Sequence, residues 1–201
     1  MLTRDSRRFL MTAIRKPISV GAVAPSSRRL GRAMIRDIDL SNGQAILELG
    51  PGTGPFTRVI RDHLTDPSRY LGIERDPGFV RHLQRRFSDL RFCRGSAEDA
   101  LAHLEQAGID NVGAIICGLP FATLPTKVQD GVIDALRQLM KPGVVFRTFQ
   151  YAHAWPMPSA ARFRHRMNGY FGRCEVTGPV MRNVPPAVVL GWEGRNGSAD
   201  S

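Results

Sequence analysis

Two acidic residues and a group of glycines are the part of this sequence whose types and spacing suggest chemistry. Glu48 comes two residues before Gly50, the first of three alternating glycines in ELGPGTG, residues 48–54. Glycines let the backbone approach a ligand where a Cβ would collide. Glu74 lies 24 positions after Gly50, about where a ribose-binding carboxylate belongs in a nucleotide-binding α/β unit. This spacing predicts a nucleotide-binding site.

The glycine spacing also bears on which nucleotide is bound. A dinucleotide fingerprint needs Gly-x-Gly-x-x-Gly, whereas Gly54 comes one residue early and Pro55 fills the expected place. A carboxylate at position 48 would repel a pyrophosphate and attract a cation such as the ammonium of a methionine moiety. S-adenosylmethionine carries that ammonium and no phosphate, so we expect it as the cofactor. A plain glycine-rich turn is the alternative interpretation.

Further cofactor contacts are expected at the ends of later strands. In residues 95–99, GSAED, the backbone at Ala97 and a carboxylate of Glu98 or Asp99 are candidates to meet an adenine ring. Ser96 and the two acids would also suit the start of a helix, and both roles can hold at once. The predicted cofactor-binding residues are Glu48, Gly50, Gly52, Thr53, Gly54, Glu74, Arg75, Ala97, Glu98 and Cys117.

Alternating strands and helices position these residues. Apolar patterns and turn residues predict strands near 45–47, 70–74, 90–93, 112–117, 144–151, 173–181 and 187–192. Helices are predicted near 2–16, 28–38, 55–64, 77–87, 97–106, 126–140 and 159–170. This order predicts an α/β fold, in which helices cover both faces of a mostly parallel sheet. The last two strands predict an antiparallel edge hairpin.

Length and composition limit the class of protein. The chain has 201 residues, 42% hydrophobic and 23% charged, which suits one soluble α/β domain. It has no run of 18 apolar residues and no signal-peptide pattern, so we expect neither a membrane span nor secretion. Its three cysteines, Cys93, Cys117 and Cys174, lack metal-ligand spacing. We therefore expect no metal site and a reducing cytoplasm.

The net charge of +10 indicates an anionic partner, either nucleic acid or a membrane surface, unless it reflects only solubility and an arginine-rich genome. Residues 2–16 combine an apolar helical stripe with flanking cations, and Pro17 ends the helix. Such a helix either lies in a membrane interface or packs on the core. Its candidate membrane residues are Leu2, Arg7, Arg8, Phe9, Arg15 and Lys16.

Residues 117–121, CGLPF, follow the fourth predicted strand at the edge where open α/β sheets bind ligands. The stretch resembles the Asn-Leu-Pro-Tyr or Asn-Leu-Pro-Phe of rRNA adenine dimethyltransferases, whose asparagine holds the target amine. Gly118 stands at the asparagine position and offers no side-chain acceptor, which argues against adenine recognition. Phe121 either lines a substrate pocket or belongs to the core.

The sequence as a whole resembles the soluble bacterial phospholipid N-methyltransferases, a class I family that uses S-adenosylmethionine. The matching stretches are residues 19–27, 46–54, 72–76, 118–121, 149–151 and 183–187. The resemblance implies a Rossmann-like sheet of seven strands. It implies methylation of the phosphatidylethanolamine headgroup to mono- and dimethylated lipid and, if a third methyl group is added, to phosphatidylcholine; the sequence does not fix the number of methyl groups. It also implies that residues 1–17 form a membrane-binding helix before a domain at 18–193 and a flexible tail at 194–201.

The resemblance and the strand ends together suggest residues for the lipid. Tyr151, which matches a family stretch, is the candidate to orient the amine, and His153 is the candidate proton acceptor. Phe121 is the third candidate catalytic residue. Candidate substrate contacts are Leu119, Pro120, Phe121 and Arg147. The lipid phosphate should meet a cation, and the sequence does not choose among Arg147, Arg162, Arg164 and Arg166.

These observations predict a cytoplasmic monomer that lies on the inner face of the cell membrane. Its partners would be an anionic membrane surface and phosphatidylethanolamine, with no nucleic acid. Two alternatives remain open. One is an RNA adenine N6-methyltransferase, which the charge favours and Gly118 disfavours. The other is a non-enzymatic membrane- or RNA-binding module, which the intact glycine loop and its two acids disfavour.

Overall fold

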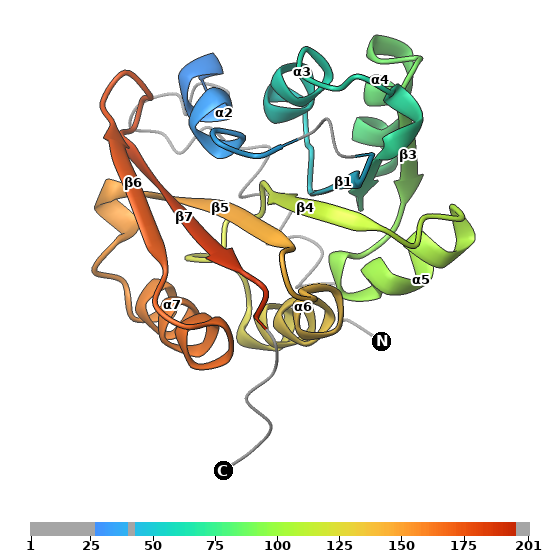
Figure 1. The fold of residues 1–201 in the computed structure, drawn as a ribbon. Coiled ribbons are helices and arrows are strands. Elements are labelled where there is room, and N and C mark those ends of the chain that lie inside the picture. The colour runs from blue at the N-terminus through green and yellow to red at the C-terminus, as the bar shows by residue number, and fades with distance from the viewer. Residues whose placement is uncertain (1–26, 40–42, 196–201) are drawn as a thin grey trace.

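A computed structural model describes residues 27–39 and 43–195, and Figure 1 shows their arrangement. The strands are β1 (Ala45–Leu49), β2 (Tyr70–Glu74), β3 (Arg91–Arg94), β4 (Val112–Cys117), β5 (Val145–Tyr151), β6 (Glu175–Val180) and β7 (Ala187–Glu193). The α-helices are α2 (Arg28–Met34), α3 (Pro55–Arg61), α4 (Pro77–Arg86), α5 (Ala100–Gln106), α6 (Thr126–Leu139) and α7 (Pro158–Phe171). Short 3-10 helices are η1 (Pro67–Arg69), η2 (Ala97–Asp99) and η3 (Ala152–Ala154).

The strands form one seven-stranded sheet in the order β3-β2-β1-β4-β5-β7-β6. The first five in this order pair in parallel, with Leu49 opposite Cys117 and Cys117 opposite Thr148. Strand β7 runs antiparallel to β5 and β6 antiparallel to β7. The predicted α/β class, the mostly parallel sheet and the antiparallel edge hairpin are therefore confirmed.

Helices cover both faces of the sheet, as Figure 1 shows. One core packs α2, α3 and α4 against residues such as Ile46, Ile116 and Phe149, and the other packs α5, α6 and α7 against residues such as Leu47 and Phe146. Ile46 and Leu47 are neighbours in β1, so alternate strand residues supply the two cores. The near-continuous apolar runs of β1 and β4 are what a sheet buried on both faces requires.

Local sequence signals explain where several helices begin and end. Asp76 caps α4 by accepting from the N–H groups of Gly78 and Phe79, and Pro77 occupies the first turn. Helix α2 ends at Met34 and is therefore shorter than the predicted 28–38. The chain turns at Asp37, whose φ is +59°. A left-handed residue cannot continue a right-handed helix.

The predicted N-terminal helix at 2–16 and most of the tail lie outside the described residues. In the described part of the chain, no helix is both long and apolar enough to cross a bilayer.

Candidate cofactor and substrate site

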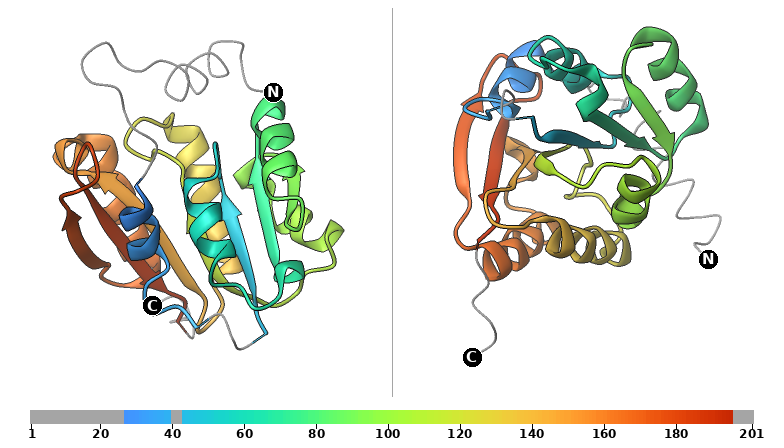
Figure 2. Two further views of the ribbon diagram at one scale, coloured as in Figure 1. Left: turned by 90° about the horizontal axis from the view of Figure 1, so that it is seen from above. Right: turned by 45° about the vertical axis from the view of Figure 1, so that its right-hand side comes forward.

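The parallel strands end together at one edge of the sheet. The loop after β1, the loop from β4 to α6 and the start of α7 all lie along this edge, which is at the top of the left view in Figure 2. Thr148 of β5 is level with Leu49 at the end of β1, and with adjacent strands about 4.8 Å apart these two residues lie roughly 10 Å from each other. Strand β5 continues beyond that level to Tyr151. The residues predicted at the ends of these strands therefore lie along one edge, which is where open α/β folds bind ligands.

The loop after β1 has the backbone that its glycines predict. Gly50, Gly52 and Gly54 have φ values of +69°, +59° and +82°, a left-handed region in which glycine carries no steric penalty. A Cβ on Gly52 would meet no atom within 4 Å, so the backbone there faces open space. The loop can thus receive a ligand closely against Gly52.

Glu74 holds this loop in place. Its Oε2 accepts a 2.9 Å hydrogen bond from the Gly52 N–H, and its Oε1 accepts one of 2.9 Å from the Asp76 N–H. Burial raises the pKa of Glu74, while the backbone N–H bonds oppose that rise. Glu74, whose carboxylate is predicted to meet a ribose, therefore also links the loop after β1 to the loop after β2.

Glu48 lies beneath α3 and is fully buried. Its Oε2 accepts hydrogen bonds from the Thr57 hydroxyl at 2.8 Å and the Tyr70 hydroxyl at 2.5 Å. Burial raises the pKa of Glu48 to about 7, and the two hydroxyl bonds only partly offset this. Its Oε1 is buried without a hydrogen-bond partner among the described residues. An acceptor left unpaired in this way suits a cationic donor.

The remaining predicted cofactor residues differ in what they offer. Ser96 caps η2 and donates from its hydroxyl to Glu98 at 2.8 Å, so the helix-cap interpretation of residues 95–99 is confirmed. Thr53 is exposed and Arg75 half-buried beside the loop, whereas Ala97 is buried in the core. The Cys117 side chain is also in the core, and its carbonyl accepts from Thr148. The predicted cofactor contact at Cys117 would therefore come from its backbone and not from its buried side chain.

Gly118 packs directly against the cofactor loop. A Cβ added to Gly118 would lie 2.6 Å from the Gly50 carbonyl oxygen, closer than any side chain tolerates. The Gly118 N–H also donates to the Leu49 carbonyl at 2.8 Å. This geometry supplies a physical reason for glycine where the RNA enzymes have asparagine: the loops after β1 and β4 leave no room for a side chain.

We expect Gly118→Ala to lower the free energy of unfolding by about 1–2 kcal/mol, because the backbone of the cofactor loop must move. Cofactor affinity should fall with it. Denaturant titration and calorimetry measure the two effects. Gly169→Ala is the matched control, because its Cβ would meet nothing within 4 Å on the exposed side of α7. A Gly118→Ala protein as stable as the control would contradict the close approach.

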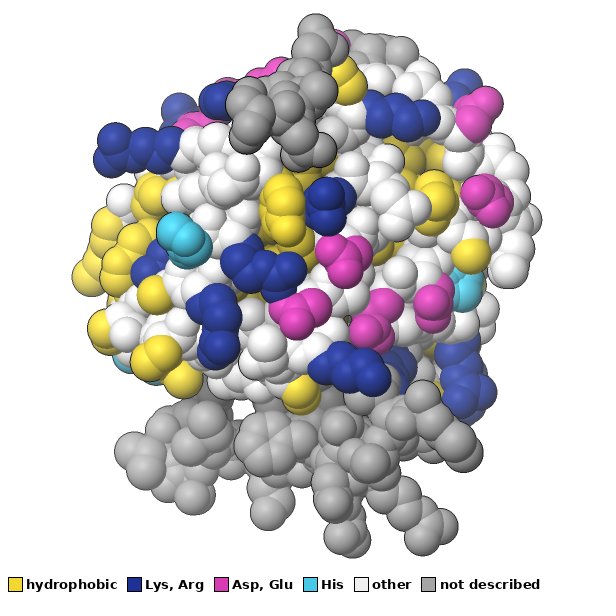
Figure 3. All heavy atoms as spheres, turned by 90° about the horizontal axis from the view of Figure 1, so that it is seen from below, with side chains coloured by type: hydrophobic (Ala, Val, Ile, Leu, Met, Phe, Trp, Pro, Cys, Tyr) yellow, Lys and Arg dark blue, Asp and Glu magenta, His cyan; other side chains and the backbone are white. Residues whose placement is uncertain are grey.

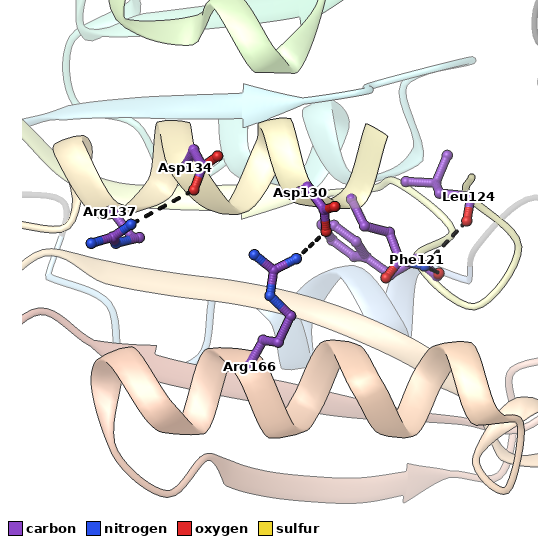
Figure 4. Close-up of polar contacts among 7 residues, drawn as sticks. Phe121, Leu124, Asp130, Asp134, Arg137 and Arg166 are labelled. Atoms are coloured by element: carbon purple, nitrogen blue, oxygen red, sulfur yellow. Dashed lines mark hydrogen bonds and ion pairs between the residues drawn. The ribbon is translucent and has the colours of Figure 1, made fainter. Parts of the chain in front are cut away.

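The loop from β4 to α6 turns Phe121 inward. Phe121 is 1% exposed and stacks on Phe163 of α7 with ring centroids 3.9 Å apart. Gln129 of α6 anchors the loop by donating to the carbonyls of Phe121 and Leu124, whose positions appear in Figure 4. Of the two interpretations of Phe121, the structure supports the core. A catalytic or pocket-lining role for its side chain is corrected accordingly.

The neighbouring residues of that loop are more accessible. Leu119 and Pro120 are half-buried. The Leu119 side chain covers Gly50, where an added Cβ would lie 2.6 Å from its Cδ2. Leu119 and Pro120 thus lie between the cofactor loop and the end of β5, as substrate contacts would.

Tyr151 and His153 lie together at the end of β5. Their rings are nearly parallel, with centroids 5.6 Å apart, and Phe149 meets Tyr151 edge-on at 5.3 Å. Tyr151 is half-buried and His153 exposed. The structure brings these two predicted residues to the same edge as the glycine loop.

Two of the four candidate arginines are occupied by acids. Arg147 donates to Glu175 of β6 at 3.0 Å from the middle of the sheet, four residues before the end of β5. Arg166 of α7 pairs with Asp130 of α6, and Figure 4 shows its side chain extending from α7 toward α6. Figure 3 shows Lys and Arg interspersed with Asp and Glu on the face that carries α6 and α7. Arg147 is therefore wrongly placed for a substrate contact.

Arg164 is held differently. Its Nη1 donates to Gln150 Oε1 at 2.6 Å, its Nη2 donates to the Trp155 carbonyl at 3.1 Å, and its guanidinium lies 3.9 Å from the Trp155 ring centroid. No acid of the described residues pairs with it. Burial lowers the pKa of Arg164, but an arginine stays charged. Gln150 is 3% exposed and its Nε2 has no partner among the described residues.

Several residues that shape this edge have no predicted role. Asp76 had a readable signal, because an Asp before Pro is a helix-cap pattern. Gln129 is a polar residue on the apolar stripe of its helix, which is a weaker signal. Thr57 and Tyr70 both donate to Glu48, and only packing brings these two residues to it.

Comparison with known proteins agrees with this geometry. The sequence model of one family, described as a methyltransferase domain, matches residues 46–143. An ornithine lipid N-methyltransferase from Singulisphaera acidiphila is 32% identical over 146 residues, which cover 71% of this chain and 76% of that protein. The chain belongs to the class I S-adenosylmethionine-dependent methyltransferases.

Solved structures share the fold at low identity. The CurJ carbon methyltransferase superimposes with a TM-score of 0.63 at 17% identity, over 88% of this chain and 56% of that one. Fibrillarin from Aeropyrum pernix, solved with S-adenosylmethionine, gives 0.61 at 16% identity over 83% and 74%. An RNA methyltransferase from Salinibacter ruber, solved with S-adenosylhomocysteine, gives 0.55 at 17% over 89% and 98%.

The cofactor is therefore S-adenosylmethionine, as predicted from the glycine loop. The residues of this chain fit it. The backbone at Gly52 faces open space, Glu74 lies at the end of β2, and the unpaired Oε1 of Glu48 is an acceptor near the first turn of α3.

Proposed function

We propose that this methyltransferase transfers methyl groups to the amine of a membrane lipid, with phosphatidylethanolamine as its substrate. The observation that carries this proposal is the 32% identity, over most of both chains, to a lipid N-methyltransferase. The geometry agrees in one respect. Gly118 offers no side chain to hold an adenine, and its contact with Gly50 explains why it must remain glycine.

The amine must be neutral before it reacts. S-adenosylmethionine supplies an electrophilic methyl group, and the amine lone pair forms the new N–C bond as the C–S bond breaks. A lipid ammonium resembles lysine, with a pKa of about 10. An apolar environment lowers that pKa by disfavouring the charge. In this proposal Tyr151 orients the amine, and the exposed His153 beside it passes the released proton to water.

Arg164 is the cation that we propose to hold the anionic group of the lipid. It lies in α7 beside the end of β5, where Gln150 and Trp155 fix its guanidinium. Arg147 and Arg166 would each have to break an ion pair with an acidic side chain before binding a ligand, whereas Arg164 pairs with no acid of the described residues. The unpaired Nε2 of Gln150 adds a donor for the same anion. A fixed guanidinium loses little entropy on binding a phosphate or carboxylate.

We expect Arg164→Ala to lower kcat/KM for phosphatidylethanolamine by about tenfold, near the lower end for a hydrogen bond to a charged group because Arg164 is half-exposed. Arg164→Lys should recover part of the loss, and cofactor affinity should not change. Arg162→Ala removes an equal charge from the exposed side of the same helix and serves as control. A long-chain primary amine without an anionic group separates binding from folding, because Arg164→Ala should not slow its methylation.

The proposed function is tested with radiolabelled cofactor and three acceptors offered separately. These are anionic vesicles containing phosphatidylethanolamine, the same vesicles containing an ornithine lipid, and RNA. Label in phosphatidylethanolamine is the expected result. Label in the ornithine lipid alone would keep lipid N-methylation and correct the substrate. Label in RNA alone would overturn the proposal.

Cellular location follows from the same proposal. A membrane lipid substrate and a charge of +10 favour a peripheral protein on the cytoplasmic face of an anionic membrane. The basic segment at 2–16 remains our predicted anchor there. We propose that the enzyme acts as a monomer.

A further inference from the structure

We infer that the turn between β6 and β7, residues 181–184, inserts into the headgroup region of an anionic lipid bilayer and brings the mouth of the site to the membrane. This inference rests on the proposed lipid substrate. It concerns a surface of the methyltransferase domain itself, distinct from the predicted helix at 2–16.

The turn lies at the site edge. Strand β7 begins at Ala187, which is opposite Tyr151 at the end of β5, and β6 ends at Val180, also opposite Ala187. The Ala152 N–H donates to the Pro186 carbonyl at 2.8 Å. The turn is therefore next to the residues proposed to receive the amine. Figure 2, in its left view, shows the turn along the same edge as the start of α7.

The apolar side chains of the turn point into solvent. Met181 and Val184 are 66% and 65% exposed, more than any other large hydrophobic residue of the described chain. Met157, also exposed, lies in the connection from β5 to α7 at the same edge. Single exposed hydrophobics are ordinary, but here the two most exposed lie in one turn, at the edge where we propose that the lipid enters.

The polar residue of the turn points inward instead. Asn183 is 2% exposed. Its Nδ2 donates to the Pro185 carbonyl at 2.7 Å, and its Oδ1 accepts from the Ser27 N–H at 2.8 Å. A turn that faces water normally has this arrangement reversed. The Asn183 bonds hold the turn firmly while Met181 and Val184 project from it.

The chemistry of the turn fits a bilayer better than a protein partner. Arg182 lies between the two apolar groups and pairs with no acid of the described residues, so it can meet an anionic headgroup. A stable protein interface needs about 800 Å² from each partner, which two or three side chains do not supply. An interfacial anchor needs only a few inserted apolar groups and nearby cations. Ser27, the first residue of the described structure, donates to Asn183, so this end of the described chain lies beside the turn.

The test replaces Met181 and Val184 together by Asp in the full chain. Vesicles contain phosphatidylethanolamine and phosphatidylglycerol, and flotation measures binding. We expect vesicle binding to fall by about tenfold, because two partly inserted side chains no longer transfer from water. Methylation of vesicle lipid should fall with it, while cofactor affinity and methylation of a monomeric short-chain phosphatidylethanolamine stay unchanged. Val176→Asp is the control, since Val176 is 49% exposed near the opposite end of β6.

A fluorescent variant reports insertion independently of activity. Val184→Trp should show blue-shifted emission with these vesicles and quenching by brominated acyl chains, and Val176→Trp should show neither. No shift for Val184→Trp, or unchanged binding by the double variant, would overturn the inference. A shift already complete without vesicles would mean that another part of the chain covers the turn, and would also overturn it. Because these readouts need no methyl transfer, insertion without lipid methylation would overturn the proposed function alone.

Discussion

Replacing Glu74 by alanine is expected to weaken S-adenosylmethionine binding by about 1.5–3 kcal/mol, the range for hydrogen bonds to a charged group. Glu74 accepts from the N–H groups of Gly52 and Asp76. The variant therefore loses a contact to the cofactor and also leaves the glycine loop without its support. Calorimetry with the cofactor measures the loss, and Glu105→Ala, an exposed acid on α5, is the control.

The cofactor-free protein distinguishes the two roles of Glu74. If the carboxylate supports the loop, hydrogen exchange at the Gly52 and Asp76 amides should be faster in the variant before any cofactor is added. The exchange rates in Glu74→Gln should lie between those of Glu74→Ala and the parent, because the glutamine amide keeps one acceptor and turns a donor toward the other N–H. Full affinity in a folded Glu74→Ala protein would remove Glu74 from the site.

The cofactor half of the site was predictable because its chemistry is local in the sequence. The glycines of 50–54 and the acid at the end of the second strand follow the chain order strand, turn, helix, strand. Parallel strands then bring their ends to one edge without further information. The fold was predictable for the same reason, since apolar runs and helix caps repeat along the chain.

The substrate half was less predictable because its residues depend on packing between distant elements. Phe121 follows a strand like a pocket residue, yet Phe163, 42 positions later, stacks on it and places it in the core. Arg147, Arg164 and Arg166 are alike in sequence, and only Glu175, Gln150 and Asp130 distinguish them. No pattern within a short window carries those pairings.

Glu48 lies between these cases, since its position was predictable and its environment was not. The sequence places it before the first glycine and predicts a carboxylate that attracts the cation of a cofactor. The structure shows that this carboxylate is buried beneath α3 with Thr57 and Tyr70. A group raised to a pKa of about 7 is largely protonated in mildly acidic solution. Glu48 therefore connects cofactor binding, pH and stability.

We expect Glu48→Gln to change how stability depends on pH. In the unfolded chain the Glu48 carboxyl has its ordinary value of 4.5, and in the folded protein its pKa is about 7. Between these values the folded state holds a proton that the unfolded state lacks, so the free energy of unfolding falls as the pH rises. The contribution of Glu48 is complete below pH 4.5 and is lost through pH 7. At about 1.4 kcal/mol per unit, the loss totals about 3 kcal/mol.

Denaturant titrations of both proteins from pH 4 to pH 8, without cofactor, test this. Glutamine keeps an oxygen for Thr57 and Tyr70 and does not titrate, so the difference in unfolding free energy should grow in its favour with pH and level off above 7. Parallel curves would show that Glu48 is charged throughout in the folded protein.

Cofactor binding should depend on pH in the opposite sense, because the ammonium of S-adenosylmethionine favours the ionised carboxylate. Cofactor affinity of the parent should rise from pH 5 to pH 8, while Glu48→Gln should bind more weakly and with little dependence on pH. A variant that gains stability at pH 8 while losing cofactor affinity would identify Glu48 as a carboxylate whose charge costs stability until the cofactor binds.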